Sequence, residues 1–117
     1  MKSMKTILGA VALLIALAGC QSGSRNVLGK APADNGITLV SAIRSVQKPV
    51  TVHGTMIDKC PVAGCWFMLR DKTGTVRVDT KSAGFVVSSV PLNTAVTVSG
   101  KVKNIGELQI AASGVRY

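Results

Sequence analysis

The stretch from Val50 to Ile57 repeats with a period of two, and this pattern limits the possible folds more than any other feature of the chain. Every second residue from Val50 to Met56 is apolar or small, and the residues between them are mostly polar or β-branched. Successive side chains of a strand point to opposite faces, so this alternation predicts a β-strand with one buried face.

Four later stretches resemble this one and are separated by turn residues. Asp71–Gly74 and Asn104–Gly106 both contain Gly, which readily adopts the positive φ that tight turns need. The additional predicted strands are Trp66–Arg70, Thr75–Thr80, Thr94–Lys103 and Glu107–Tyr117. Five strands with little helix predict an all-β fold, a small five-stranded closed or nearly closed barrel. Its core must be mainly Val, Ile, Leu and Met, because aromatic residues make up only 3% of the chain.

One short helix is predicted before the first strand. Within Thr38–Val46, apolar residues at helical spacing follow Thr38, which is a suitable capping residue. Pro49 discourages helix beyond Gln47. By contrast, Ser82–Asn93 shows no clear periodicity.

The first residues have the composition of a secretory signal. Two lysines within Met1–Lys5 precede the apolar run Ile7–Ala18, which is shorter than the ~18 residues that a spanning helix needs. The run ends in Leu17-Ala18-Gly19-Cys20, which resembles the bacterial lipobox. That resemblance implies cleavage before Cys20 and lipid attachment to its thiol. Gln21 in the next position implies the outer membrane, facing the periplasm.

These features divide the chain into three parts. Residues 1–19 are the predicted signal peptide, 20–36 a lipidated flexible tether rich in small and polar residues, and 37–117 the folded domain. Removal of the signal would leave 98 of the 117 residues, with 12 basic residues against five acidic ones. This excess favours contact with anionic lipid headgroups over an acidic polymer, because the basic residues are dispersed along the chain.

Several strand motifs together resemble bacterial OB-fold domains, and in particular small exported OB-fold proteins with a Cys-x4-Cys-Trp element. The motifs are Val52-x-Gly54-x-Met56, Cys60-x4-Cys65-Trp66-x-x-Leu69, Val76-Arg77-Val78, Gly84-Phe85-Val86-Val87 and Val96-x-Val98-x-Gly100-x-Val102. The resemblance covers roughly Leu39–Tyr117. It implies a Greek-key barrel whose second and third strands and first loop often bind the ligand. It implies no catalytic activity.

Cys60 and Cys65 flank the predicted loop between the first two strands. In an oxidising compartment they are expected to form a disulfide, which stabilises by roughly 2 kcal/mol because the loop is short. A copper or zinc site is the second interpretation, with His53, Met56 or Met68 as further ligands. A redox-active pair is the third, although the spacing is not Cys-x-x-Cys.

Four side chains of the second and third predicted strands and of the turn between them are candidates for ligand binding. Trp66 could stack on a base or a sugar, assisted by Arg70, Lys72 and Arg77. Alternatively, Trp66 fills the core, since the barrel has few other large side chains.

No spacing supports a nucleophile–base pair, a phosphate loop or a carboxylate pair, so the chain is not expected to be an enzyme or to need a cofactor. The sequence predicts a lipid-anchored periplasmic binding module. Its expected partners are the membrane and an anionic ligand or envelope protein. Scarce aromatic residues and export argue against nucleic acid. Metal binding and oligonucleotide or anionic-polysaccharide binding are the alternatives.

Overall fold

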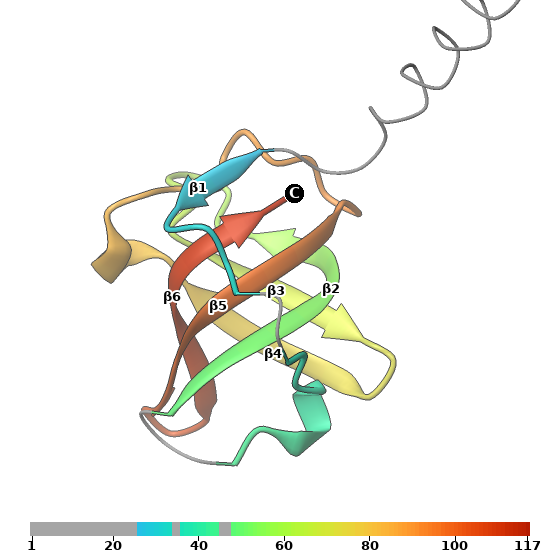
Figure 1. Ribbon diagram of the computed structural model, residues 1–117. Coiled ribbons are helices and arrows are strands. Elements are labelled where there is room, and N and C mark those ends of the chain that lie inside the picture. Colours follow the sequence, from blue (N-terminus) through green and yellow to red (C-terminus); the bar gives the residue numbers. More distant parts are fainter. Residues whose placement is uncertain (1–25, 34–35, 45–47) are drawn as a thin grey trace, which may run out of the picture.

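Five long strands wrap into a closed barrel, and a sixth, short strand pairs with one of them (Figure 1). The computed structural model describes residues 26–33, 36–44 and 48–117. Its elements are β1 (Val27–Gly29), η2 (Val40–Ala42), β2 (Pro49–Lys59), β3 (Trp66–Asp71), β4 (Gly74–Asp79), η3 (Lys81–Ala83), β5 (Ala95–Asn104) and β6 (Leu108–Arg116). The predicted signal peptide and lipidated Cys20 lie outside these residues. In the described part of the chain, no helix has the length and apolar character to cross a membrane.

The strands close the barrel in the order β2–β3–β4–β6–β5, with β5 returning to β2. All neighbours are antiparallel except β4 and β6, which run parallel because the segment between β4 and β5 carries the chain across the barrel. The predicted all-β, five-stranded barrel is confirmed, and the arrangement is consistent with an OB-fold. Each of the five predicted strands is present within a few residues of its expected bounds.

The core consists of the apolar positions that the two-residue pattern placed on one face. Each fully buried Val, Leu, Ile, Phe or Met side chain contributes roughly 1.5–3 kcal/mol relative to exposure. The buried apolar strand residues are Val52, Met56, Phe67, Leu69, Val76, Val78, Val96, Val98, Val102, Ile110, Ala112 and Val115. Phe67 is the largest of them, whereas Trp66 is partly exposed on the opposite face of β3. The interpretation of Trp66 as a core residue is therefore wrong.

The segment between β4 and β5, which the sequence left unassigned, inserts two valines into the core. After the single turn η3, Val87 and Val90 are both fully buried. The Val87 N–H donates to the Gly64 carbonyl across 2.8 Å, which ties this segment to the β2–β3 loop.

The short helix before the first barrel strand is only the three-residue 3-10 turn η2. Thr38 does not cap it. Its N–H instead donates to the Thr51 carbonyl at 2.7 Å, and η2 begins after Leu39 without a side-chain cap. Asp71 supplies the missing acceptor, because its Oδ2 takes a hydrogen bond from the Val40 N–H at 2.8 Å.

Part of the predicted tether is ordered against the barrel. β1 pairs antiparallel with the end of β6, and Asn26 and Tyr117 exchange two backbone hydrogen bonds of 3.1 and 2.9 Å. The chain then crosses the outer face of the barrel as a strap, defined here as residues 30–33 and 36–38. The prediction of a flexible tether over residues 20–36 therefore does not hold for β1 or for the part of the strap before Thr38. The pairing of β1 could not be predicted, because Val27–Gly29 has no apolar periodicity that would mark it as a strand.

Candidate functional site

The outer face of β3 and β4 carries the predicted ligand residues, but the structure separates them into two pairs. The Arg77 guanidinium lies 4.6 Å from the centre of the Trp66 ring. Arg70 and Lys72 lie farther along, beside a cavity of about 480 Å³ that also contacts His53. The four side chains therefore do not form one continuous binding surface.

The charges beside Trp66 are largely compensated within the protein. Lys103 Nζ lies 2.8 Å from Asp79 Oδ2. Burial acts to raise the pKa of Asp79, but the hydrogen bond from Lys103, a backbone N–H and the nearby positive charges together hold this pKa below its usual value. Trp66 already stacks with Arg77. A polymer would have to displace these contacts to stack on the ring.

The smaller cavity lies where η2 approaches the β3–β4 turn. Asp71 Oδ1 accepts hydrogen bonds from the Thr73 N–H and hydroxyl, at 2.7 and 2.6 Å. His53 Nδ1 is 2.9 Å from the Thr97 hydroxyl on β5. Asp71 and His53 thus have structural partners, which makes this cavity a weaker candidate than the one described below.

The candidate metal ligands are not brought together. Met56 is fully buried in the core, and His53 is bonded to Thr97. Across residues 26–33, 36–44 and 48–117, no three side chains of the types His, Cys, Asp and Glu form a group that could hold a metal. Cys60 and Cys65 therefore belong to no such group.

Cys60 and Cys65 are partly exposed free thiols at the ends of the β2–β3 loop. The predicted disulfide is not formed in this structure, and the pairing stays a prediction. The backbone N–H groups of Ala63, Val62 and Gly64, in decreasing order of effect, lower the pKa of Cys60 from 9.0 to about 6. Cys60 is therefore a thiolate at neutral pH.

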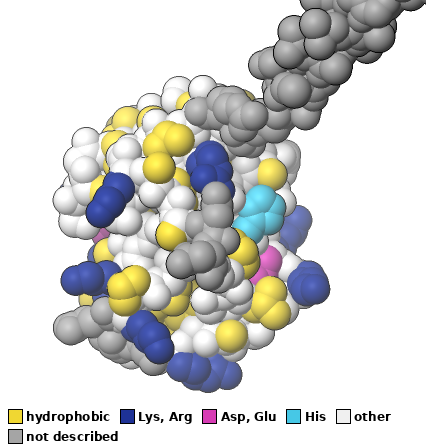
Figure 2. Space-filling view, in the orientation of Figure 1, with side chains coloured by type: hydrophobic (Ala, Val, Ile, Leu, Met, Phe, Trp, Pro, Cys, Tyr) yellow, Lys and Arg dark blue, Asp and Glu magenta, His cyan; other side chains and the backbone are white. Residues whose placement is uncertain are grey.

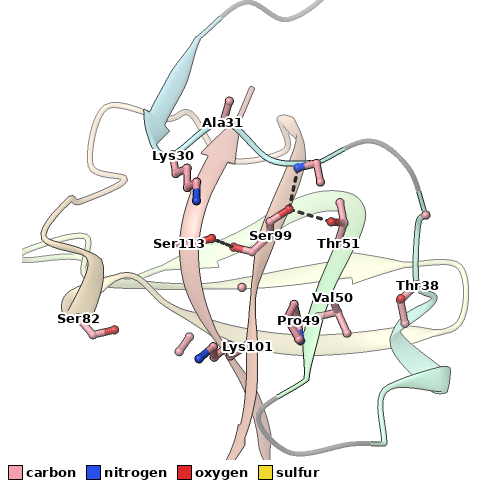
Figure 3. A pocket seen from close by; sticks show the side chains of 14 residues that line it. Lys30, Ala31, Thr38, Pro49, Val50, Thr51, Ser82, Ser99, Lys101 and Ser113 are labelled. Atoms are coloured by element: carbon pink, nitrogen blue, oxygen red, sulfur yellow. Dashed lines mark hydrogen bonds between the residues drawn. The ribbon is translucent and has the colours of Figure 1, made fainter.

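The larger cavity is a groove of about 660 Å³ between the strap and the outer surface of β2, β5 and β6 (Figure 3). Its floor is made of small or apolar residues, including Val50, Gly100 and Ala111. Two lysines reach it, Lys30 from the strap and Lys101 from β5. No acidic side chain is among its lining residues in the described part of the chain.

Ser99 connects the groove wall to the strap. Its Oγ accepts the Ala33 N–H at 3.1 Å and lies 2.8 Å from the Thr51 hydroxyl, while its carbonyl accepts the Ser113 hydroxyl at 3.0 Å (Figure 3). These bonds fix both the strap and the hydroxyl groups that face the groove. This site was not predicted from the sequence, because part of its wall comes from residues assigned to the tether, namely Lys30, Ala31, Ala33 and Gly36.

Basic side chains surround the barrel without forming a stripe. Figure 2 shows Lys and Arg side chains dispersed over the visible face, separated by uncharged atoms. A nucleic-acid groove normally combines a continuous basic track with several exposed aromatic rings. The dispersed charge instead suits local contacts with single acidic groups.

No family model and no curated protein matches this chain. Among solved structures, the chain is similar to the hypothetical protein YgiW from E. coli, with a TM-score of 0.54 and 19% sequence identity. The match covers 70% of this chain and 89% of the YgiW chain. At this identity, the likeness supports the small β-barrel fold and carries no information on function.

Proposed function

We propose that this protein is a non-enzymatic binding module of the cell envelope that holds a small anion with an apolar body in the groove beneath the strap. The observation that carries the proposal is the composition of the groove. Two lysines and several hydroxyl groups line it together with small apolar residues, and none of its lining residues within 26–33, 36–44 and 48–117 is acidic.

The size and chemistry of the groove both fit such a ligand. Small-molecule sites typically occupy about 300–1,000 Å³, with mostly apolar walls and a few polar groups that orient the ligand. An ammonium group binds an acid group as a compact point charge, and it adapts to different acids through a flexible stem. In the view of Figure 3, Lys30 and Lys101 approach the groove from above and below Ser113, so one acidic head could contact either of them.

Octanoate provides a direct test, because it combines a carboxylate with a short apolar chain. We expect its titration into isotope-labelled protein to shift the NMR signals of Ser99, Lys101 and Ser113. The double substitution Lys30→Ala/Lys101→Ala should weaken binding about tenfold, since each exposed ionic contact is worth up to about 1 kcal/mol.

Lys72→Ala is the matched control, because Lys72 belongs to the smaller cavity and not to the groove. It should leave octanoate affinity unchanged, and octanol should bind the wild type and the double variant equally. Signal changes confined to the Trp66 face, or equal losses in the double variant and the control, would place the binding site elsewhere.

Membrane attachment through Cys20 completes the proposal, and the lipobox-like sequence supports it. A lipidated protein at the outer membrane would present the groove to the periplasm. Cys20→Ala should release the protein from membranes or block its processing. Complete retention of this variant in the membrane fraction, with no mass change beyond the substitution, would contradict lipid anchoring.

A further inference from the structure

The β2–β3 loop carries two partly exposed thiols at its ends, which backbone hydrogen bonds hold in place, and its tip is exposed. The Cys60 N–H donates to the Trp66 carbonyl at 3.0 Å, and the Cys65 carbonyl accepts the Thr80 N–H at 2.9 Å. Val62, at the tip, is 91% exposed. The two cysteines are thus fixed by the strand ladder and the β4–β5 segment, while the residues between them project into solvent.

Gly64 shapes the turn between the two cysteines. Its φ of +66° lies in the left-handed region, and a Cβ at this position would lie 2.7 Å from the Ser88 nitrogen. In this turn, backbone N–H groups of residues 62 to 65 act on the Cys60 sulfur and lower its pKa. One of these N–H groups belongs to Cys65, which places the backbone of the second cysteine beside the first sulfur.

Charged side chains do not account for the stabilised thiolate. The ionisable groups nearest to Cys60 in the strand ladder are engaged elsewhere: Asp58, Lys59, Arg77 and Asp79. The influences that lower the pKa of Cys60 are all hydrogen bonds from the backbone. A ring of N–H groups that binds an anion in this way is known from other turn conformations.

We propose that Cys60 and Cys65 form a thiol–disulfide exchange site for low-molecular-weight disulfides, in which Cys60 attacks and Cys65 resolves. The assignment rests on two free, partly exposed thiols at the two ends of one short turn, whose ends are held by the backbone hydrogen bonds of Cys60 and Cys65. The backbone N–H groups of this turn act on the Cys60 sulfur, which makes Cys60 the attacking thiol. This assignment does not depend on the proposed ligand groove.

The reaction balances without any further reagent. The Cys60 thiolate attacks one sulfur of a disulfide RSSR, which forms a Cys60–SR mixed disulfide and releases RS⁻. Cys65 then loses its proton to solvent and attacks the Cys60 sulfur, which forms the Cys60–Cys65 disulfide and releases the second RS⁻. Two protein thiols are oxidised, and one disulfide is reduced to two thiols.

The lower pKa of Cys60 should raise its reaction rate above that of an ordinary thiol, and the difference should be largest at low pH. A pKa of about 6 instead of 9.0 raises the thiolate fraction, and the lower intrinsic nucleophilicity of such a thiolate offsets part of that gain. Combining the two effects, we expect Cys60 to react about fourfold faster than an ordinary thiol at pH 7, and about fortyfold faster at pH 5.

The test uses reduced full-length protein in which Cys20, the third cysteine of the chain, is replaced by alanine in every variant and in the reference called wild type below. Glutathione disulfide is the probe, and intact mass is the readout. Wild type should lose the mass of two hydrogen atoms without retaining glutathione. Cys65→Ser should accumulate one glutathione at Cys60, with a rate that is half-maximal near pH 6. Cys60→Ser should react more slowly than Cys65→Ser at pH 5. Val62→Ala is the control for substitution in the loop and should behave as wild type.

Three results would overturn the proposal. The first is equal rates in the two single-serine variants at pH 5, since Cys60 would then have no special role. The second is a wild type that retains glutathione at Cys60, since Cys65 would then not resolve it. The third is stoichiometric copper or zinc in protein isolated without chelator, lost only when both cysteines are replaced, since the loop would then be a metal site. Circular dichroism of each variant verifies that the barrel remains folded.

Discussion

The groove and the cysteine loop are built on the same barrel by different means. The groove is a side-chain site, in which lysines, hydroxyls and small residues from four segments meet beneath a strap that does not belong to the barrel. The cysteine loop is a backbone site, in which N–H groups of one short turn surround a single sulfur. Substitutions in the turns of the barrel should therefore leave the groove intact, whereas displacement of the strap should destroy it. Substitutions of the loop side chains should leave the cysteine loop intact, whereas a change in its backbone φ angles should destroy it.

The largest loss of stability should come from Gly114→Ala, which should disturb the groove and leave the cysteine loop unchanged. A Cβ at this position would lie 1.5 Å from the Lys30 carbonyl oxygen, so the strap must move away from β6. We expect a loss of about 3 kcal/mol in the free energy of unfolding, together with loss of octanoate binding. Urea denaturation and the NMR titration measure the two effects.

Gly36→Ala is the matched control in the strap, because a Cβ there has no neighbour within 4 Å. Its stability should stay within about 0.5 kcal/mol of wild type. The reaction of Cys60 with glutathione disulfide should be unchanged in both variants. A slower Cys60 reaction in Gly114→Ala would show that the two regions are coupled.

An intermediate loss of stability is expected from Gly64→Ala, which should disturb the cysteine loop and leave the groove unchanged. The positive φ and the approach to Ser88 should together cost about 2 kcal/mol. As the turn rearranges, the N–H groups leave the sulfur, and the pKa of Cys60 should rise from about 6 towards 9.0. The pH profile of Cys60 alkylation should move upward accordingly.

Gly84→Ala tests the effect of a positive φ by itself, without the close approach to a neighbouring atom that Gly64 also has. Gly84 has a φ of +82°, but a Cβ there would meet no atom within 4 Å. It should cost about 1 kcal/mol and leave the alkylation profile in place. If both variants shift the profile equally, the turn at Gly64 is not what lowers the pKa of Cys60.

The last prediction concerns the pH dependence of stability in the reduced protein. The pKa of Cys60 is lower in the folded state, at about 6, than the ordinary value of 9.0 expected after unfolding. Its contribution to stability is therefore fully present above pH 9 and is lost as the pH falls through 6. Relative to Cys60→Ser, the wild type should gain stability between pH 6 and 9, measured by urea denaturation with reductant. Cys65→Ser keeps Cys60 and should follow the wild type, whereas parallel curves for all three proteins would contradict the assignment.

The sequence predicted the barrel strands well because their information is local. The alternation around Val52 and Met56, and later around Val96 and Val98, follows directly from one buried face per strand. The choice between Trp66 and Phe67 as the core residue could not be made in this way, because both are apolar and adjacent. A shift of one position reverses the faces.

The candidate sites depended on information that is not local. Lys30 and Lys101 are far apart in the sequence, and they line the same groove only because β1 pairs with β6 and draws the strap across β5. The cysteine loop was recognised from Cys60 and Cys65, but the effect of the surrounding N–H groups requires the φ of Gly64. His53 and Met56 were plausible metal ligands by residue type. Their positions in β2 place Met56 in the core and His53 beside the Thr97 hydroxyl, so they do not meet.

The pairing of Asn26 with Tyr117 sets how far the barrel could stand from a bilayer. If Cys20 carries the lipid, only six residue steps separate the acyl chains from Asn26, the first residue that the structure describes. This segment spans at most about 20 Å when it is fully extended. That length reaches only a short way beyond the headgroup layer. The domain would then ride against the membrane surface, where its excess of lysine and arginine meets lipid phosphates and where amphiphilic anions are most concentrated.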